Sequence, residues 1–373
     1  LDWTMAFDKV SHAGLHIALK RFGLPDEYIE AIDDIYTHAT FQVKEEQYMS
    51  STKTQTSGIR QGCPLSPYLF IIFLSVLMHD AREDASEKLN HTRPHLYSFN
   101  DDIADLEYAD DIVLFSRTRA HLQQMLHSLQ HEAQYYGMLL NRDKTKTLLL
   151  HPTSPDPFTF FDHTPEQPQT VKQATSITYL GILIQSSAHT RPHINQKLSF
   201  ARKDFNKLIR LWQHTNINTK FKLKIFSAIF PPQILYCLHH TWQIESVQTQ
   251  LDSWQTKQLR RVLKWKSAYY SHNAGTHLTN DKVYQVTHHK PFSTQVADAQ
   301  VQYYAHITRH PDESIYTVCF GPGLAERAIN AKRRVGRPRH HWLPNVEPIL
   351  YQRAASLQPT RKLPGNISLQ GPK

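Results

Sequence analysis

Leu106-Glu-Tyr-Ala-Asp-Asp-Ile-Val-Leu-Phe115 places two adjacent carboxylates, those of Asp110 and Asp111, directly before an apolar run. The apolar run predicts a buried β-strand, so the two aspartates are expected at a tight turn that enters it, most simply a β-hairpin. Two like charges beside a buried strand repel each other and lose hydration, and a divalent cation between them offsets that cost. A solvated Asp-Asp turn is the simpler alternative for this pair taken alone.

The composition allows a packed core and favours a polyanionic partner. The chain has 373 residues, of which 40% are hydrophobic, and a formal net charge of +9 at pH 7. This length is enough for two domains, and the excess of basic residues favours nucleic acid as the partner. The three cysteines, Cys63, Cys237 and Cys319, are far apart and odd in number. They predict a reducing compartment, nucleus or cytoplasm, and a protein that is not secreted.

Two further classes of site are disfavoured by the sequence. The longest apolar run, residues 68–78, is too short to span a bilayer, so it predicts a buried helix and no membrane partner. The 24 histidines are scattered, without cysteines at ligand spacing, and therefore argue against a zinc site. The sequence starts inside what reads as a strand, at a residue that is not methionine, so a fragment of a larger protein is expected.

The first half of the chain predicts short strands mixed with helices. A strand carrying Asp2 is expected to lead into a helix with Ser11 as its N-cap and Gly23 after its end. A second helix is predicted over 26–36, a hairpin of polar strands over 41–54, and an apolar helix from Pro67 to about 82, followed by a polar loop to 105. The apolar positions expected to face the core are Leu15, Ile17, Ala18, Leu19 and Phe22 in the first helix and Tyr28, Ile32 and Ile35 in the second.

Beyond the Asp-Asp stretch the mixed pattern continues and then gives way to helices. A helix over 121–136, a turn carrying Asn141 and Lys144, a proline-rich loop over 151–169 and a bent strand around Gly181 complete an α+β pattern. Helices are then predicted over 194–213, over 219–236 with a break at Pro231-Pro232, and over 247–264, continuing less clearly to about 329. Their basic residues are interleaved with aromatic ones, which is typical of a phosphate-binding face or of a solvated surface. A basic run follows at 332–339, and the last 30 or so residues are expected to be poorly ordered.

Five short blocks occur in a characteristic order. They are Asp2-Trp-Thr-Met-Ala-Phe-Asp-Lys-Val10, Gly58-Ile-Arg-Gln-Gly-Cys-Pro-Leu-Ser-Pro67, Tyr108-Ala-Asp-Asp111, residues 137–145 and Tyr179-Leu-Gly181. In this order they resemble the reverse transcriptase domain of LINE-type, non-LTR retrotransposons, and segments 232–242 and 333–342 are similar to the helices downstream of that domain. The resemblance covers about half of the chain and is specific as an ordered set.

The resemblance implies an α+β fold: a right-hand polymerase palm, with an antiparallel sheet and packed helices, over residues 1–184. A helical thumb and connection over 185–310 and a basic, partly disordered region over 311–373 would follow. The implied activity is that of an RNA-directed DNA polymerase, which acts on an RNA template, a DNA primer or duplex and deoxynucleoside triphosphates. It would use two Mg²⁺ ions, with Mn²⁺ as the alternative ion, for nucleotidyl transfer onto the primer 3′ hydroxyl.

The resemblance also assigns roles to individual residues. Asp2, Asp110 and Asp111 would bind the metal ions, and Lys144 would assist the pyrophosphate leaving group. Phe7 would pack where a ribose 2′ hydroxyl would lie, although it also fits a core position. The incoming nucleotide and template would contact Gln61 and Gly62, with Arg60 nearby. The primer end would be lined or held by Tyr108, Ala109, Tyr179, Leu180 and Gly181.

Several departures from the family pattern keep other interpretations open. The family carries a fingers region before its first palm block, and neither that region, an endonuclease nor a Cys-rich knuckle is found here. An N-terminally truncated chain with poor primer extension is therefore expected. The main alternative is a catalytically inactive nucleic-acid-binding remnant of a transposable element. Another two-metal palm enzyme, such as a nucleotide cyclase, is disfavoured by the blocks at 57–67 and 179–181.

Overall fold

The computed structural model describes residues 1–89, 104–116, 118–150, 156–161, 169–187, 189–214, 216–241, 244–266, 278–313, 316, 346, 349 and 350. The chain divides into two compact units. The first comprises Leu1–Gly181 and Gln185–Ala188, and the second Ile182–Ile184 and His189–Lys373. Each unit has its own hydrophobic core. The basic run at 332–339 lies outside the described residues.

The first unit opens with helices that begin and end at the expected residues. A short helix, α1 (Ala6–Lys9), is followed by α2 (His12–Phe22) and α3 (Asp26–Thr37). The hydroxyl of Ser11 accepts a hydrogen bond from the amide of Gly14, and Gly23 ends α2 with φ 93°. Both signals were predicted, because a hydroxyl satisfies a free amide at a helix start and glycine tolerates positive φ at its end. The short α1 was not predicted, since a short strand ending at Asp2 was expected to be followed by a turn into α2.

The buried faces of α2 and α3 differ from the prediction. Ile17 and Phe22 of α2 are about half exposed, and α2 buries Leu15, Ala18 and Leu19. In α3 the buried stripe is Ile29, Ile32 and Tyr36, whereas the predicted Tyr28 and Ile35 are exposed. The sequence of α3 carries two overlapping stripes at helical spacing. Packing against α2 selects one of them, and that choice is not encoded within α3 alone.

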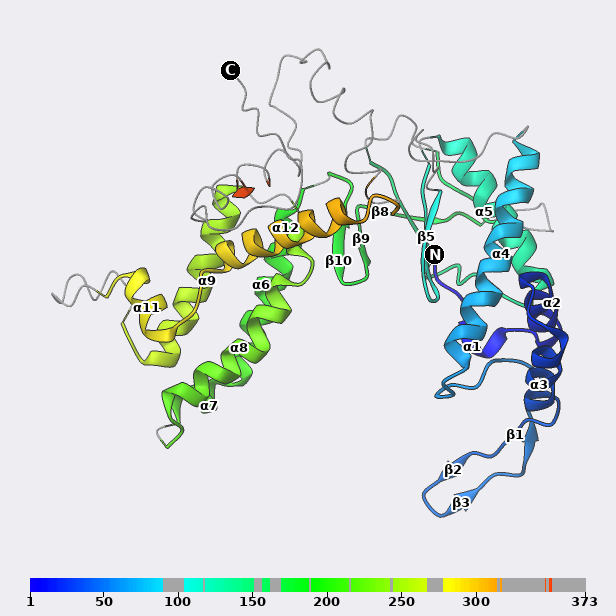
Figure 1. Cartoon of the computed structure of the whole chain (residues 1–373), viewed down its shortest axis with the longest axis horizontal. Helices are drawn as coiled ribbons and strands as arrows, with labels where there is room; N and C mark the ends of the chain where they lie inside the picture. The colour runs from blue at the N-terminus through cyan, green and yellow to red at the C-terminus, as the bar shows by residue number, and fades with distance from the viewer. Residues whose placement is uncertain are drawn as a thin grey trace, which may run out of the picture. The chain divides into compact units, whose positions relative to one another are not determined.

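The centre of the first core is α4 (Ser66–Lys88), which packs against α2 and against α5 (Arg119–Tyr135) (Figure 1). Its residues Leu69, Phe70, Phe73, Leu77 and Met78 are fully or almost fully buried. The helix runs six residues past the predicted end at about 82, so the expected loop over 83–88 is helical. Ala85 and Ser86 are buried in this extension, which adds packing that the polar sequence does not reveal.

The strands form small sheets. The polar hairpin over 41–54 is confirmed as β1 (Thr40–Phe41) with β4 (Lys53–Thr54) and, at its tip, β2 (Lys44–Glu45) with β3 (Tyr48–Met49). The remaining strands are β5 (Asp105–Tyr108), β6 (Asp111–Leu114), β7 (Lys146–Leu148), β8 (Lys172–Ala174), β9 (Ser176–Tyr179) and β10 (Ile182–Gln185). Among the described residues the strands are assigned to five two-stranded sheets, and β7 pairs with β8 in parallel. This differs from a single antiparallel palm sheet.

The second unit is helical. It contains α6 (Arg191–Lys207), α7 (Ile209–Gln213), α8 (Thr219–Leu235), the 3₁₀ turn η1 (Leu238–His240), α9 (Glu245–Leu263), α11 (Asn280–Thr287) and α12 (Phe292–Arg309). Phe205, Phe226, Phe230 and Phe292 are buried in its core. None of the helices among the described residues is long and apolar enough to cross a membrane.

Two predicted boundaries in the second unit were wrong. The helix expected over 194–213 is divided at Leu208 into α6 and α7. The helix expected to break at Pro231-Pro232 continues through both prolines as α8. Two prolines remove two amide donors and leave the carbonyls four residues earlier, on Ser227 and Ala228, without them. Both of these residues are exposed, so water can solvate the carbonyls and the helix is retained.

Gly58 offers a test of how the loop before α4 packs on α1. Its amide donates to the carbonyl of Val10 at 2.8 Å, its φ is +90°, and an added Cβ would lie 2.9 Å from backbone atoms of Asp8. Gly58→Ala should therefore lower the free energy of unfolding of the first unit by about 2–4 kcal/mol, through both strain and collision. Urea denaturation measures this loss when unfolding is monitored by hydrogen exchange in peptides from residues 1–89.

Gly23→Ala is the matched control for conformational strain alone. Gly23 also has positive φ, but an added Cβ there meets nothing within 4 Å. This variant should lose only about 1 kcal/mol. Equal losses in the two variants would mean that the contact between Gly58 and Asp8 has no energetic weight.

Candidate functional site

An extended segment at the start of the first unit lies between two other parts of the chain. The amino group of Leu1 donates to the carbonyl of Ile112 in β6 at 2.7 Å. On the other side Trp3 forms an antiparallel bridge with Leu140, and the amide of Asn141 donates to the carbonyl of Asp2 at 2.8 Å. Asp2 is thus held by backbone hydrogen bonds between β6 and residues 139–141, in an extended segment close to the short strand that was predicted to carry it.

The predicted hairpin around Asp110 and Asp111 is confirmed. β5 and β6 pair antiparallel with Tyr108 opposite Asp111, so Ala109 and Asp110 form a two-residue turn. Ala109 has φ 51°, a conformation that costs about 1–2 kcal/mol in a residue other than glycine. Asp110 and Asp111 are exposed, whereas the next residue, Ile112, is buried. The turn therefore presents both carboxylates to solvent at the end of a buried strand.

Asp2 and Asp111 lie on adjacent segments of the chain. The hydrogen bond from Leu1 to Ile112 joins the residues next to them in sequence. Burial raises the pKa of Tyr179, and the charge of Asp111 adds to that rise. Tyr179 therefore lies within electrostatic range of Asp111.

The three aspartates do not form one tight ligand cluster. Two groups of at least three potential metal ligands within the described residues have ligand atoms all within 4.8 Å of one another, and neither group contains Asp2, Asp110 or Asp111. Mutual repulsion favours such separation of carboxylates. The backbone brings Asp2 and Asp111 to adjacent segments, and Asp110 follows at the turn next to Asp111. Their carboxylate oxygens are the hard donors that suit Mg²⁺.

Residues 141–145 surround Asp2. The ammonium of Lys144 lies 3.7 Å from Asp2 Oδ1, and its side chain is 67% exposed. The side chain of Asn141 accepts a hydrogen bond from the amide of Lys144, and the hydroxyl of Thr145 accepts one from the amide of Asp2. Sequence reasoning selected Lys144 but assigned no role to Asn141 and Thr145. Both residues lie in the same short sequence block as Lys144, and this was the sequence signal that could have assigned them to the site.

A partly buried charge cluster joins the hairpin to α4. Arg82 donates to both carboxylate oxygens of Asp105, at 2.8 and 2.6 Å, and also to Glu107. The Asp105 side chain is 8% exposed. Burial raises the pKa of Glu107, the charge of Arg82 opposes that rise, and Asp105 adds to it. One guanidinium therefore serves two carboxylates on β5, and sequence reasoning missed it because the partners belong to separate elements.

The loop before α4 carries three of the predicted residues on its surface. Arg60, Gln61 and Gly62 are exposed, and the Gln61 amide donates to Asp8 Oδ1 at 3.3 Å. Phe7 stacks on Phe70 of α4, with ring centroids 4.4 Å apart, and its carbonyl accepts from the amide of Ile59. Phe7 is half-buried. It thus packs against the core and keeps part of its ring accessible.

The predicted turn at 179–181 has the backbone of a tight hairpin. Leu180 and Gly181 both have positive φ, 45° and 77°, between the end of β9 and the start of β10. Positive φ at both central residues is typical of a type I′ turn. In the second unit the amide of Leu183 donates to Nδ1 of the buried His193 at 3.1 Å. His193 Nε2 is buried and has no hydrogen-bond partner among the described residues.

Comparison with known proteins identifies relatives of both parts of the chain. Residues 1–184 match the family model for reverse transcriptase (RNA-dependent DNA polymerase). The chain is 28% identical over 148 residues to the Retrovirus-related Pol polyprotein from type-2 retrotransposable element R2DM of Drosophila melanogaster, covering 40% of this chain and 13% of that protein. It is 25% identical over 276 residues to the RNA-directed DNA polymerase from mobile element jockey of the same species, covering 70% and 28%.

A third relative is the Retrovirus-related Pol polyprotein from type-1 retrotransposable element R2 of Nasonia vitripennis, 28% identical over 204 residues. That match covers 52% of this chain and 19% of the relative. The chain therefore spans less than a third of the length of these relatives. The similarity to the jockey protein covers 70% of the chain, so it extends beyond the 184 residues of the family match.

Arg82→Gln should loosen the hairpin that carries Asp110. The change leaves the carboxylates of Asp105 and Glu107 without their cation, which should lower the free energy of unfolding by about 1–3 kcal/mol. Hydrogen exchange of residues 104–116 should become faster. Lys88→Gln, on the same helix, removes an exposed pair with Asp84 and should cost less than about 0.5 kcal/mol. Unchanged exchange in Arg82→Gln would show that the guanidinium does not anchor β5.

His193 should make the second unit sensitive to acid. Burial, and secondarily the charge of Lys197, lowers the pKa of His193 to about 4, whereas an unfolded histidine has a pKa near 6.5. Between these values the unfolded state binds more protons, so the free energy of unfolding should fall as the pH falls from 6.5 to 4, by up to about 3 kcal/mol. Denaturation midpoints at several pH values measure this change.

His193→Gln should flatten that part of the pH profile, and the difference between the two proteins isolates this group from other histidines. His189→Gln is the control, because His189 is exposed. Parallel profiles for the wild-type and His193→Gln proteins would rule out the neutral, buried imidazole as the source of acid sensitivity.

Proposed function

Because residues 1–184 are a reverse transcriptase domain homologous to the RNA-directed DNA polymerases of non-LTR retrotransposons, we propose that this chain belongs to an enzyme that extends a primer 3′ hydroxyl with deoxynucleotides on an RNA template, and that the chain does so poorly on its own. The observation that carries the proposal is the placement of Asp2. Backbone hydrogen bonds hold it beside the strand that follows Asp111, and Lys144 contacts its carboxylate. Residues distant in sequence thus supply carboxylates and a cation to one location.

Asp2, Asp110 and Asp111 are the proposed metal ligands. Their oxygen donors suit two Mg²⁺ ions or Mn²⁺, and their exposed or half-exposed positions leave room for water and phosphate oxygens. Bound there, the metal ions would lower the pKa of the primer hydroxyl and stabilise charge on the leaving pyrophosphate. The protein's own contribution is positional, since the hydrogen bonds of Leu1, Asn141 and Thr145 fix the backbone of Asp2 on both sides.

Lys144 is the proposed general acid for the pyrophosphate. Its ammonium contacts Asp2 at 3.7 Å, but the side chain is largely exposed and forms no second ion pair within the described part of the chain. A long, flexible and exposed lysine side chain can move from a carboxylate to a phosphate oxygen. There it can donate a proton or stabilise negative charge. The hydrogen bond between Asn141 and the Lys144 amide keeps the base of this side chain beside Asp2.

The other residues of the site are proposed to bind substrates. Arg60, Gln61 and Gly62 lie on an exposed loop, where the nucleotide and template can contact them. Phe7 is held by its stacking on Phe70, so a rigid aromatic edge is available to exclude a ribose 2′ hydroxyl. The tight turns containing Tyr108 and Ala109, and Tyr179, Leu180 and Gly181, would hold the primer.

The helical unit is proposed to bind the duplex as a thumb. We propose boundaries of 1–184 for the palm, 185–310 for the thumb and connection, and 311–373 for the basic C-terminal region. Arg202 of α6 and Lys257 of α9 line a pocket of about 230 Å³ together with Trp254. Two cations lining one pocket suit the phosphates of a nucleic-acid backbone. The nucleus or cytoplasm, where RNA and primer are present, is the proposed location.

Primer extension tests the proposal directly. The purified chain should extend a primed RNA template with deoxynucleotides and Mg²⁺ only weakly, and Asp110→Asn should reduce that residual rate at least about 100-fold, since it removes a charge from the metal-binding group. Asp34→Asn, an exposed change on α3, is the matched control and should leave the rate unchanged.

A binding measurement on the same proteins separates catalysis from recognition. Asp110→Asn should still bind primed template, because phosphate contacts dominate affinity. Template binding without extension by the wild-type chain would support the alternative, a nucleic-acid-binding remnant. Extension that Asp110→Asn does not slow would exclude this aspartate as a metal ligand.

A further inference from the structure

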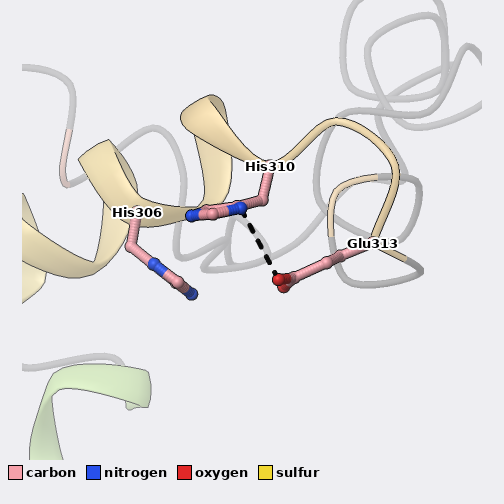
Figure 2. Close-up of side chains that lie close together, drawn as sticks. All are labelled: His306, His310 and Glu313. Atoms are coloured by element: carbon pink, nitrogen blue, oxygen red, sulfur yellow. Dashed lines mark ion pairs between the residues drawn. The ribbon is translucent and has the colours of Figure 1, made fainter.

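The C-terminal end of α12 gathers three potential metal ligands. The sequence His306-Ile-Thr-Arg-His310-Pro-Asp-Glu313 places two histidines one helical turn apart and a glutamate three residues later. The imidazole rings of His306 and His310 have centroids 4.6 Å apart. Figure 2 shows the carboxylate of Glu313 directed toward His310, and both imidazole rings on the same side of the helix end. Scattered histidines had argued against a zinc site in the sequence, but two of them are brought together here.

The backbone after α12 holds Glu313 in this position. The amide of His310 donates to the carbonyl of Ile307 at 3.1 Å, and the amide of Glu313 donates to the carbonyl of His310 at 3.2 Å. The turn directs the glutamate back toward the helix, where Glu313 Oε1 lies 3.8 Å from His310 Nδ1. One ligand atom from each of the three residues lies within 4.8 Å of the other two.

We propose that His306, His310 and Glu313 bind one Zn²⁺ ion. Two imidazole nitrogens and one carboxylate oxygen are a ligand set that zinc uses in proteins, with a fourth position left for water. Zinc-to-ligand distances of about 2.0–2.2 Å in a tetrahedron place the donors roughly 3.4 Å apart. The observed 3.8 Å between Nδ1 and Oε1 is close to that value, so side-chain rotation without backbone movement is sufficient.

The electrostatic setting favours a cation. The last carbonyls of a helix carry partial negative charge, and His306 and His310 lie at the C-terminal end of the 18-residue α12. All three side chains are exposed, so an ion from solution reaches them, and its fourth position can keep a water molecule. Arg309 lies in the same stretch and opposes a cation, whereas Asp312 favours it; the two formal charges offset each other.

An ion pair alone does not account for the cluster. An exposed pair of His310 with Glu313 contributes little to stability and gives no reason for His306 to lie against the same ring. The other group with metal-ligand spacing, Asp84, His131 and Glu132, is a weaker candidate. There the carboxylate of Asp84 is already paired with the ammonium of Lys88 at 2.7 Å. A lysine at that position competes with a metal ion for the same oxygen.

Zinc bound here would join the last turn of α12 to the segment that leaves it. Its ligands are separated by four and then three residues, so the ion would bridge residues 306–313 in the way that a short crosslink does. The site shares no residue with the proposed metal ligands, Asp2, Asp110 and Asp111, which belong to the first unit. Loss of primer extension therefore neither supports nor contradicts it.

Titration of the chelator-treated full chain tests the proposal. Co²⁺ titration should give the visible absorption of a tetrahedral site at one equivalent, and Zn²⁺ should displace it. His306→Gln, His310→Gln and Glu313→Gln should each weaken Zn²⁺ binding by at least about tenfold, because each removes one of three ligands. His38→Gln is the control, since it removes a single exposed histidine from the first unit and should leave the affinity unchanged.

Hydrogen exchange locates the ion. Zn²⁺ should slow exchange of amides in residues 306–313 of the wild-type chain and leave exchange in the three variants unchanged. The proposal is overturned if no stoichiometric Zn²⁺ binding is detected, or if binding persists in all three variants, which would assign the metal to others of the 24 histidines.

Discussion

Two sets of backbone hydrogen bonds, one on each side of Asp2, hold the candidate catalytic site together. On one side Leu1 donates to Ile112, and on the other Asn141 donates to the carbonyl of Asp2. Both sets are made by main-chain atoms. The carboxylates and the Lys144 ammonium are therefore carried by a main-chain framework. Such a framework keeps charged groups near one another even when their mutual repulsion would separate them.

Burial and charge are balanced differently on the two sides of the hairpin. At its turn, Asp110 and Asp111 are exposed and stay hydrated. On β5, the largely buried side chain of Asp105 and the partly exposed side chain of Glu107 both pair with Arg82 of α4. This pairing attaches β5 to α4, whereas Asp110 and Asp111 at the turn remain available to ligands. A single hairpin thus carries both anchoring carboxylates and exposed ones.

The sequence predicted those features that depend on interactions between residues close together in the chain. Ser11 and Gly23 marked the ends of α2 because a helix cap involves only neighbouring residues, and the two-residue turn at Ala109 and Asp110 followed from the apolar run behind it. The five ordered blocks also led to the family that the comparisons support. Packing across elements was not accessible in this way. The face that α3 buries, the extension of α4 to Lys88 and the contact of Arg82 with β5 all depend on partners far away in sequence.

The hydrogen bond from the amide of Asp2 to the hydroxyl of Thr145 joins residues 143 positions apart. A ribosome that adds 5–20 residues per second needs roughly 7–30 s to bring the second partner out after the first. Helices such as α2 and α4 can form within microseconds of their synthesis, because their contacts are local. During that interval the segment around Asp2 lacks its neighbour at residues 139–141 and has its backbone groups open to other strands. Correct assembly of the site in the cell therefore depends on the order in which its segments are synthesised as well as on their geometry.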